Sequence, residues 1–113
     1  MNWALGARAR LDIRIILSAS EAQFGEAARR RYRLLLEQAI QDVAENPQRS
    51  GVSAAAREGM WLYHTRHARP RTPPKQRVGR PRHLIVFAII GDELRVLRVL
   101  HDAMDLPERL KDV

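Results

Sequence analysis

Several features are scarce or missing in this chain: it has no cysteine, two lysines, two tyrosines and no long apolar run. Without cysteine, disulfides and thiolate metal sites are excluded, and the chain is compatible with a reducing cytosol. The longest apolar run covers residues 84–90, far short of the roughly 20 residues that a membrane helix needs. Arginines interrupt residues 1–10, so no signal sequence is predicted there. We therefore expect a cytoplasmic, unprocessed protein with no membrane partner, no metal and no cofactor.

What the chain does have is positive charge on an ordinary globular composition. Its 113 residues fit one domain, residues 1–113, and 45% of them are hydrophobic. The net charge is +7, and nearly all of the positive charge is arginine. Arginine makes planar, bidentate contacts to phosphate or carboxylate. The charge predicts a polyanion or an acidic protein as partner, but it does not choose between DNA, RNA, the ribosome and an acidic peptide.

Two helices are predicted in the first half of the chain. Residues 8–24 carry apolar side chains at helical spacing, and Gly25 can end that helix. Residues 26–45 have a second stripe, which Asn46-Pro47 terminates. The short link predicts an antiparallel αα-hairpin. The first stripe is Leu11, Ile15, Ala19 and Ala22, and the second is Ala28, Tyr32, Leu35, Ala39 and Val43, with Leu36 and Ile40 alongside.

The second half of the chain predicts a sheet. Residues 2–5 and 60–66 favour short strands, and residues 83–90 and 94–100 favour a hairpin around Gly91-Asp92. The order of elements indicates an α+β fold with a small antiparallel sheet. Both hairpin strands are apolar on both faces, so something besides the helices must cover the sheet. Residues 48–59 read as a loop, 67–82 as a basic, proline-rich, mobile loop, and 101–113 as a tail with Leu106 and Leu110 as docking points and Pro107 at a helix start.

Three stretches of sequence together resemble the ParE branch of the ParE/RelE toxin superfamily, over about residues 5–110. The stretch with the most specific pattern ends the last strand with Arg-Val-Leu-His and continues to Met-Asp-Leu. The three stretches are Ala9-Arg10-Leu11-Asp12-Ile13 with Gln23-Phe24-Gly25-Glu26-Ala27-Ala28 and Tyr32; Glu45-Asn46-Pro47 with Gly59 and Tyr63-His64-Thr65-Arg66-His67; and Pro81-Arg82-His83-Leu84-Ile85-Val86-Phe87 with Leu97-Arg98-Val99-Leu100-His101-Asp102-Ala103-Met104-Asp105-Leu106.

The resemblance implies a fold, a partner and an activity. It implies an αα-hairpin packed on a small antiparallel sheet, and a growth-inhibiting toxin of a type II toxin–antitoxin system of the plasmid-stabilisation kind. It also implies a ParD-like antitoxin whose C-terminal segment wraps the toxin in a hetero-oligomer. In the ParE branch the target is DNA gyrase, and in the RelE branch the activity is ribosome-dependent cleavage of mRNA. A non-toxic basic interaction module is a third alternative.

Candidate residues were assigned for each kind of contact. Candidates for nuclease catalysis are Arg82, Arg98 and His101. Candidates for target binding are Arg66, Arg82, His83, Arg95, Arg98 and His101. Candidates for antitoxin binding are Tyr32, Leu36, Ile40, Trp61, Phe87 and Ile89. His64 and His67 have a spacing that resembles metal ligands, but on a strand they fall on opposite faces.

The residues favour an inhibitor over an enzyme. Enzymes of the ribonuclease branch use lysines, arginines and a late tyrosine or histidine around the scissile phosphate. This chain has lysine only at Lys75 and Lys111, and Ala103-Met104-Asp105 stands where a late tyrosine would lie. Strand alternation places Arg95 and Arg98 on opposite faces, so they cannot share one site. We therefore expect gyrase inhibition rather than RNA cleavage, with His101 as the one candidate acid or base.

Overall fold

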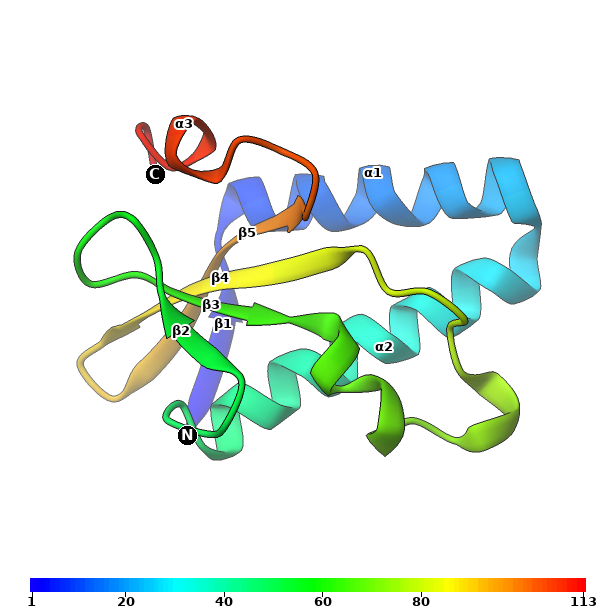
Figure 1. Ribbon diagram of the computed structural model, residues 1–113, viewed down its shortest axis with the longest axis horizontal. Coiled ribbons are helices and arrows are strands. Elements are labelled where there is room, and N and C mark those ends of the chain that lie inside the picture. The colour runs from blue at the N-terminus through cyan, green and yellow to red at the C-terminus, as the bar shows by residue number, and fades with distance from the viewer.

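A computed structural model describes all residues, 1–113, as one α+β unit. Its order is strand, two helices, four strands and a short C-terminal helix (Figure 1). No helix has the length and apolar character needed to cross a membrane. The elements are β1 (Asn2–Leu5), α1 (Ala7–Phe24), α2 (Glu26–Glu45), β2 (Val52–Ala54), β3 (Trp61–His64), β4 (His83–Ile90), β5 (Glu93–His101) and α3 (Leu106–Arg109).

The five strands form one mixed sheet in the order β1-β5-β4-β3-β2. Strands β2 to β5 are antiparallel to their neighbours, as predicted, whereas β1 lies parallel to β5 at one edge. The sequence prediction missed β2, which was assigned to a loop. Two of its three residues, Ser53 and Ala54, are small and exposed, so the segment has no apolar alternation that would mark it as a strand.

The two helices form the predicted hairpin and lie together on one face of the sheet (Figure 1). Gly25 joins them with φ at 95°, a conformation that favours glycine because a side chain would be strained there. The main core lies between the hairpin and the sheet. Its largest fully buried side chains include Leu35 and Leu36 of α2 with Tyr63, Ile85 and Phe87 of the sheet.

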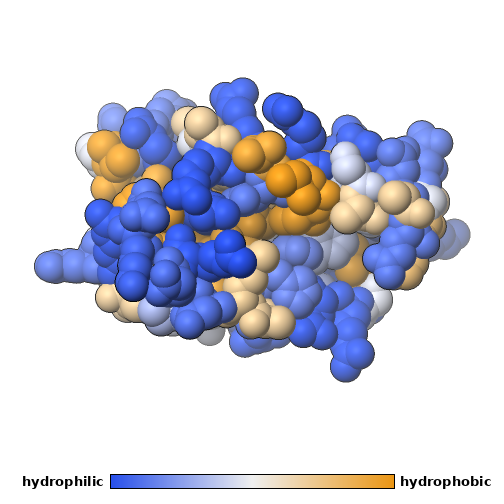
Figure 2. All heavy atoms as spheres, turned by 90° about the horizontal axis from the view of Figure 1, so that it is seen from above, coloured by the Kyte–Doolittle hydropathy of each residue, from blue (hydrophilic) through white to orange (hydrophobic).

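Helix α1 turns a different face to the core than the sequence predicted. Leu11, Ile15, Ala19 and Ala22, the predicted inward stripe, are all exposed. The inward side chains are Ala9, Ile13, Ile16 and Leu17. Because α1 has apolar residues on both sides, their spacing alone does not tell which side is buried. Figure 2 looks onto the molecule from the side of α1 and shows apolar side chains at the middle of that surface, between hydrophilic ones.

The C-terminal tail covers part of the second face of the sheet. Leu110 is 1% exposed and belongs to a small second core with Leu84, Val86 and Leu100. Leu106 packs against the same cluster, so the predicted docking points are confirmed. Arg57 of the β2–β3 connection donates hydrogen bonds to the carbonyl oxygens of Leu110 and Lys111, and also contacts that of Val113. The chain's own tail is therefore one answer to what covers this face.

Residues 67–82 are more structured than predicted. They include the short 3-10 helices η2 (Arg69–Arg71) and η3 (Pro74–Gln76). The Arg71 guanidinium lies 2.9 Å from the carboxylate of buried Asp42, and Arg77 donates to the carbonyl oxygens of Thr72 and Pro70. Prolines rule out long helices or strands here, but they are compatible with single tight turns. The expectation of a loop without regular structure was wrong, because arginines tie it to α2 and to its own backbone.

Candidate functional site

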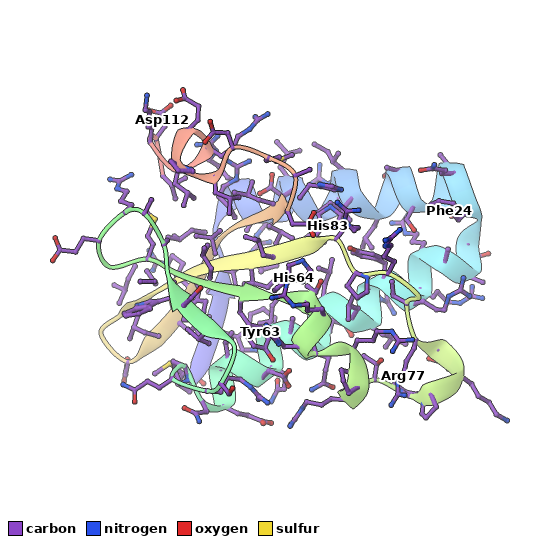
Figure 3. All side chains as sticks on the ribbon, viewed as in Figure 1. Phe24, Tyr63, His64, Arg77, His83 and Asp112 are labelled. Atoms are coloured by element: carbon purple, nitrogen blue, oxygen red, sulfur yellow. The ribbon has the colours of Figure 1, made fainter.

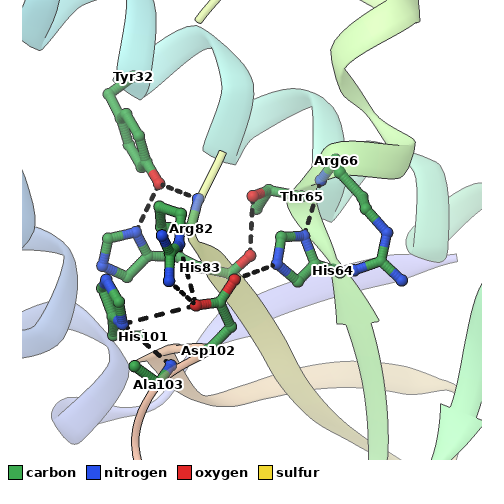
Figure 4. A network of polar contacts seen from close by, with 9 residues as sticks. All are labelled: Tyr32, His64, Thr65, Arg66, Arg82, His83, His101, Asp102 and Ala103. Atoms are coloured by element: carbon green, nitrogen blue, oxygen red, sulfur yellow. Dashed lines mark hydrogen bonds and ion pairs between the residues drawn. The ribbon is translucent and has the colours of Figure 1, made fainter. Parts of the chain in front are cut away.

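Charged and aromatic side chains from four elements meet at one end of the sheet, where β4 begins and β5 ends. His83 of β4 is paired in register with His101 of β5, and their rings lie edge to face with centroids 5.2 Å apart. His64 comes from the end of β3, so His64 and His83 lie at the same end of their strands (Figure 3). Tyr32 reaches the group from α2, and Arg82 and Asp102 flank the two strands (Figure 4).

Asp102 is the centre of the charged half of this polar network. One carboxylate oxygen accepts hydrogen bonds from Arg82 Nη2 at 2.9 Å and Nε at 3.1 Å. The other carboxylate oxygen lies 2.9 Å from His64 Nε2. Hydrogen bonds from His64 and then from Arg82 lower the pKa of Asp102 to about 2. The carboxylate is therefore ionised at neutral pH, and Arg82 compensates its charge.

Backbone hydrogen bonds set the tautomers of two histidines. The Arg66 N–H donates to His64 Nδ1 at 3.0 Å, so a neutral His64 carries its proton on Nε2 and donates to Asp102. The Ala103 N–H likewise donates to His101 Nδ1 at 3.0 Å. A neutral His101 therefore also carries its proton on Nε2, and its side chain is 37% exposed.

Tyr32 and His83 make up the uncharged half of the network. The Arg82 N–H donates to the Tyr32 hydroxyl at 3.2 Å, and that hydroxyl lies 2.5 Å from His83 Nδ1. Burial and the neighbouring His101 lower the pKa of His83 to about 4, so His83 is neutral at neutral pH. Burial raises the pKa of Tyr32, so the hydroxyl keeps its proton and donates it to His83. Thr65 Oγ1 donates to the His83 carbonyl oxygen at 2.7 Å and fixes the start of β4.

The network is mostly satisfied within the chain, which limits the chemistry it can perform. RNA cleavage of the acid–base type needs one group to take a proton from the 2′-hydroxyl, another to give one to the leaving oxygen, and a cation at the phosphate. His83 is a poor proton donor because its pKa is about 4. Arg82 is paired with Asp102, whose negative charge lies where a phosphate would be held. The arrangement is better suited to presenting a fixed polar surface than to transferring protons.

The structure brings three of the predicted target-binding residues together and separates two others. Arg82, His83 and His101 lie in the network, and Arg66 joins it through its backbone N–H. The fifth candidate, Arg95, is exposed and pairs with Glu93 at 3.2 Å. It shares no contact with Arg98, in agreement with the prediction that the two cannot form one site.

Arg98 is a correction to the predicted site. Its Nε and Nη2 donate to the Asp12 carboxylate of α1 at 2.7 and 3.0 Å, and the Val99 N–H donates to the same group at 3.0 Å. The hydrogen bond to Asp12 raises the pKa of Arg98. Both side chains are largely buried, so Arg98 connects α1 to β5 and is neither a catalytic nor a target-binding group.

The predicted antitoxin-binding residues divide in the same way. Leu36, Ile40 and Phe87 are at most 3% exposed and belong to the core, so the prediction that they contact a partner was wrong. Their apolar character reflects packing of the helix hairpin on the sheet. Tyr32 lies in the polar network. Trp61 and Ile89, 40% and 37% exposed, are the two candidates that a partner can reach.

Tyr32, His64 and Asp102 are the network residues that sequence reasoning did not place in the site. A tyrosine was sought only near the tail, whereas Tyr32 approaches from α2, 51 residues before His83. Its position on the predicted inward stripe of α2 was the available signal. His64 was considered only with His67 as a metal pair. The two diverge, since His64 faces Asp102 and the His67 ring packs against Tyr63 at 5.4 Å.

Comparison with known proteins gives one match. The family model described as "ParE toxin of type II toxin-antitoxin system, parDE" matches residues 5–106, which is nearly the whole chain. The matched region includes every element from the end of β1 to the start of α3, and the complete polar network. No match to an individual curated protein was found.

Proposed function

Because the chain belongs to the ParE toxin family of type II toxin–antitoxin systems, we propose that it stops growth by binding and inhibiting DNA gyrase in the cytoplasm. The observation that carries this proposal is the self-satisfied polar network, in which no acid, base and free cation stand ready for RNA cleavage. An inhibitor that acts by binding needs only a fixed surface of the right charge. The net charge of +7 and the accessible Arg66, Arg82 and His101 supply one.

The partner that neutralises the toxin is proposed to be a ParD-like antitoxin. Apolar antitoxin side chains would cover Trp61 and Ile89, and antitoxin carboxylates would pair with arginines at the rim. In register, Trp61 pairs with Phe87, and Ile89 follows two residues later on the same face of the sheet. This exposed aromatic and aliphatic surface is typical of the anchor positions of protein interfaces.

A second candidate function is ribosome-dependent cleavage of mRNA. One observation favours it: Tyr32, Arg82, His83 and His101 lie in one network at the end of the sheet, although the sequence suggested a single histidine with scattered arginines. The Nε2 of His101 and the guanidinium of Arg66 are also free of contacts within the chain. The two functions make opposite predictions in cells.

One culture distinguishes the functions. On expression without antitoxin, plasmid DNA isolated from the cells should lose negative supercoiling before growth stops, while mRNA stays intact at ribosomes. Co-expression of the antitoxin should restore growth. Site-specific mRNA cuts with supercoiling unchanged would move the protein to the endoribonuclease alternative. Unimpaired growth would indicate the third alternative, a non-toxic basic module.

A further inference from the structure

The N-terminal half of α1 exposes two large aliphatic side chains. Leu11 is 51% exposed and Ile15 is 58% exposed, and they lie one helical turn apart. They contribute nothing to the main core, because Ala9, Ile13 and Leu17 supply the inward face of this helix. Side chains of this size have a reason to be hidden, so their exposure side by side suggests contact with another molecule.

Unpaired cations surround these two residues. Arg8, Arg10 and Arg14 are all exposed on the same half of α1. The acidic residues of the helix are Asp12 and Glu21, and they are already bound by Arg98 and Arg29. The only polar contact from the three side chains is that of Arg8, which lies 3.5 Å from the Asp112 carbonyl oxygen. No carboxylate of the helix remains to neutralise them.

These arginines do not stabilise the helix that carries them. The N-terminal end of a helix has a partial positive charge and favours acidic residues, yet the first turn of α1 has none, and Gly6 provides no side-chain cap. Arg10 and Arg14 are four residues apart, a spacing at which like charges repel. The positive charge therefore has no structural use within the chain, and it is suited to a negatively charged partner.

We propose that these five residues, Arg8, Arg10, Leu11, Arg14 and Ile15, form the α1 surface that binds an acidic, amphipathic helix of the antitoxin. The apolar side of that helix lies on Leu11 and Ile15, and its carboxylates pair with the arginines and face the positive end of α1. A second copy of the chain is a poor occupant, since its arginines would meet the same arginines on a protein of net charge +7. The inference rests on the place of this chain in a toxin–antitoxin system and does not depend on the identity of the target.

The test measures binding of the purified cognate antitoxin to variants of the full-length toxin. Leu11→Glu/Ile15→Glu is expected to weaken binding by about tenfold or more, through faster dissociation, because it removes apolar contacts and adds repulsion. Leu11→Ala/Ile15→Ala should weaken it in the same direction but less. Arg10→Ala/Arg14→Ala should slow association and reduce its dependence on salt. All four positions are exposed, so the thermal unfolding midpoint should stay close to that of the wild type.

Matched controls lie on the same helix hairpin. Phe24 is 69% exposed at the far end of α1 (Figure 3), and Arg30 is already paired with Glu26. Phe24→Glu and Arg30→Ala should leave antitoxin affinity within about twofold of wild type.

Three results would overturn the proposal. One is antitoxin binding by Leu11→Glu/Ile15→Glu that matches the wild type. A second is unchanged antitoxin binding with loss of gyrase inhibition in the same variant, which would assign the surface to the target. The third is a dimer of the free toxin that this variant dissociates, which would assign the surface to a second copy. Gyrase inhibition is measured separately, so failure of the gyrase proposal leaves the antitoxin result interpretable.

Discussion

At the scale of single residues, protonation states are determined by hydrogen bonds and burial. Three of the four histidines are held by the polar network, and His83 is the one with the strongest shift, its pKa falling to about 4. Backbone N–H groups hold Nδ1 of His64 and of His101, whereas a buried tyrosine hydroxyl holds that of His83. A neutral His83 is thus part of the folded structure, and its protonation opposes folding.

This shift predicts how stability changes in mild acid. An unfolded histidine binds its proton near pH 6.5, whereas folded His83 does so only near 4, so the unfolded state holds more protons between these values. The stabilisation is complete above about pH 6.5 and is lost as the pH falls towards 4, by on the order of 2 kcal/mol after allowance for solvent screening. Chemical unfolding at a series of pH values measures it.

The control for the pH prediction is His83→Gln. The pKa of His67 is also lowered by burial and nearby arginines, so the variant should keep a smaller dependence of the same sign. Asp102 has a lowered pKa too, but its contribution is lost only below about pH 4. A variant with the full wild-type dependence between pH 4 and 6.5 would show that His83 is not its source.

Two arginines of β5 give a matched pair for stability. Asp12→Ala leaves the largely buried Arg98 without its carboxylate and should lower the free energy of unfolding by about 3 kcal/mol. Arg95 is 44% exposed and pairs only with Glu93, so Arg95→Ala should change it by less than about 0.5 kcal/mol. Equal effects of the two substitutions would contradict the assignment of Arg98 as a structural residue.

At the scale of elements, one extra residue in β5 decides which side chains meet. The pairing shifts between Val86 and Phe87, which leaves Leu97 without a partner in β4. Counted from the hairpin turn without this bulge, His83 would pair with Leu100, and His101 would turn to the opposite face. The bulge therefore assembles the candidate site.

This bulge marks how far the sequence could predict the site. Helix and strand positions followed from apolar periodicity, caps and turn residues, and most of them are confirmed. The bulge has no signal in periodicity because residues 94–100 are apolar on both faces. For the same reason the inward side of α1 was assigned wrongly. Long-range contacts such as Tyr32 with His83 depend on the packing of the hairpin against the sheet, and no local pattern encodes that packing.

The tail is an element whose role is testable by a single truncation of a side chain. Leu110 is 1% exposed in the second core, so Leu110→Ala should lower the free energy of unfolding by about 2–3 kcal/mol. The neighbouring Lys111 is 68% exposed at its side chain, and Lys111→Ala should have little effect. Denaturant unfolding of both variants compares them directly. A stability for Leu110→Ala equal to wild type would mean that the tail does not cover the sheet in solution.

At the scale of the whole molecule, positive charge and exposed apolar side chains divide the work of binding an acidic partner. Charge at a net +7 accelerates encounter, and the apolar contacts keep the complex together. We predict that raising the salt concentration slows association of toxin and antitoxin, while the dissociation rate stays nearly constant. Surface plasmon resonance at several ionic strengths measures both rates. Complete loss of binding at moderate salt would show that charge, and not apolar contact, holds the complex.

The central claim is that this ParE-family chain acts by binding gyrase without cleaving RNA. The most direct measurement is a supercoiling assay with purified gyrase and antitoxin-free toxin, with ribosome-bound mRNA incubated in parallel. We expect supercoiling to fall as toxin is added, recovery when antitoxin is added, and intact mRNA. His101→Ala should inhibit gyrase nearly as well as the wild type, since no proton transfer is required. Unaffected supercoiling together with mRNA cuts that disappear in His101→Ala would contradict the claim.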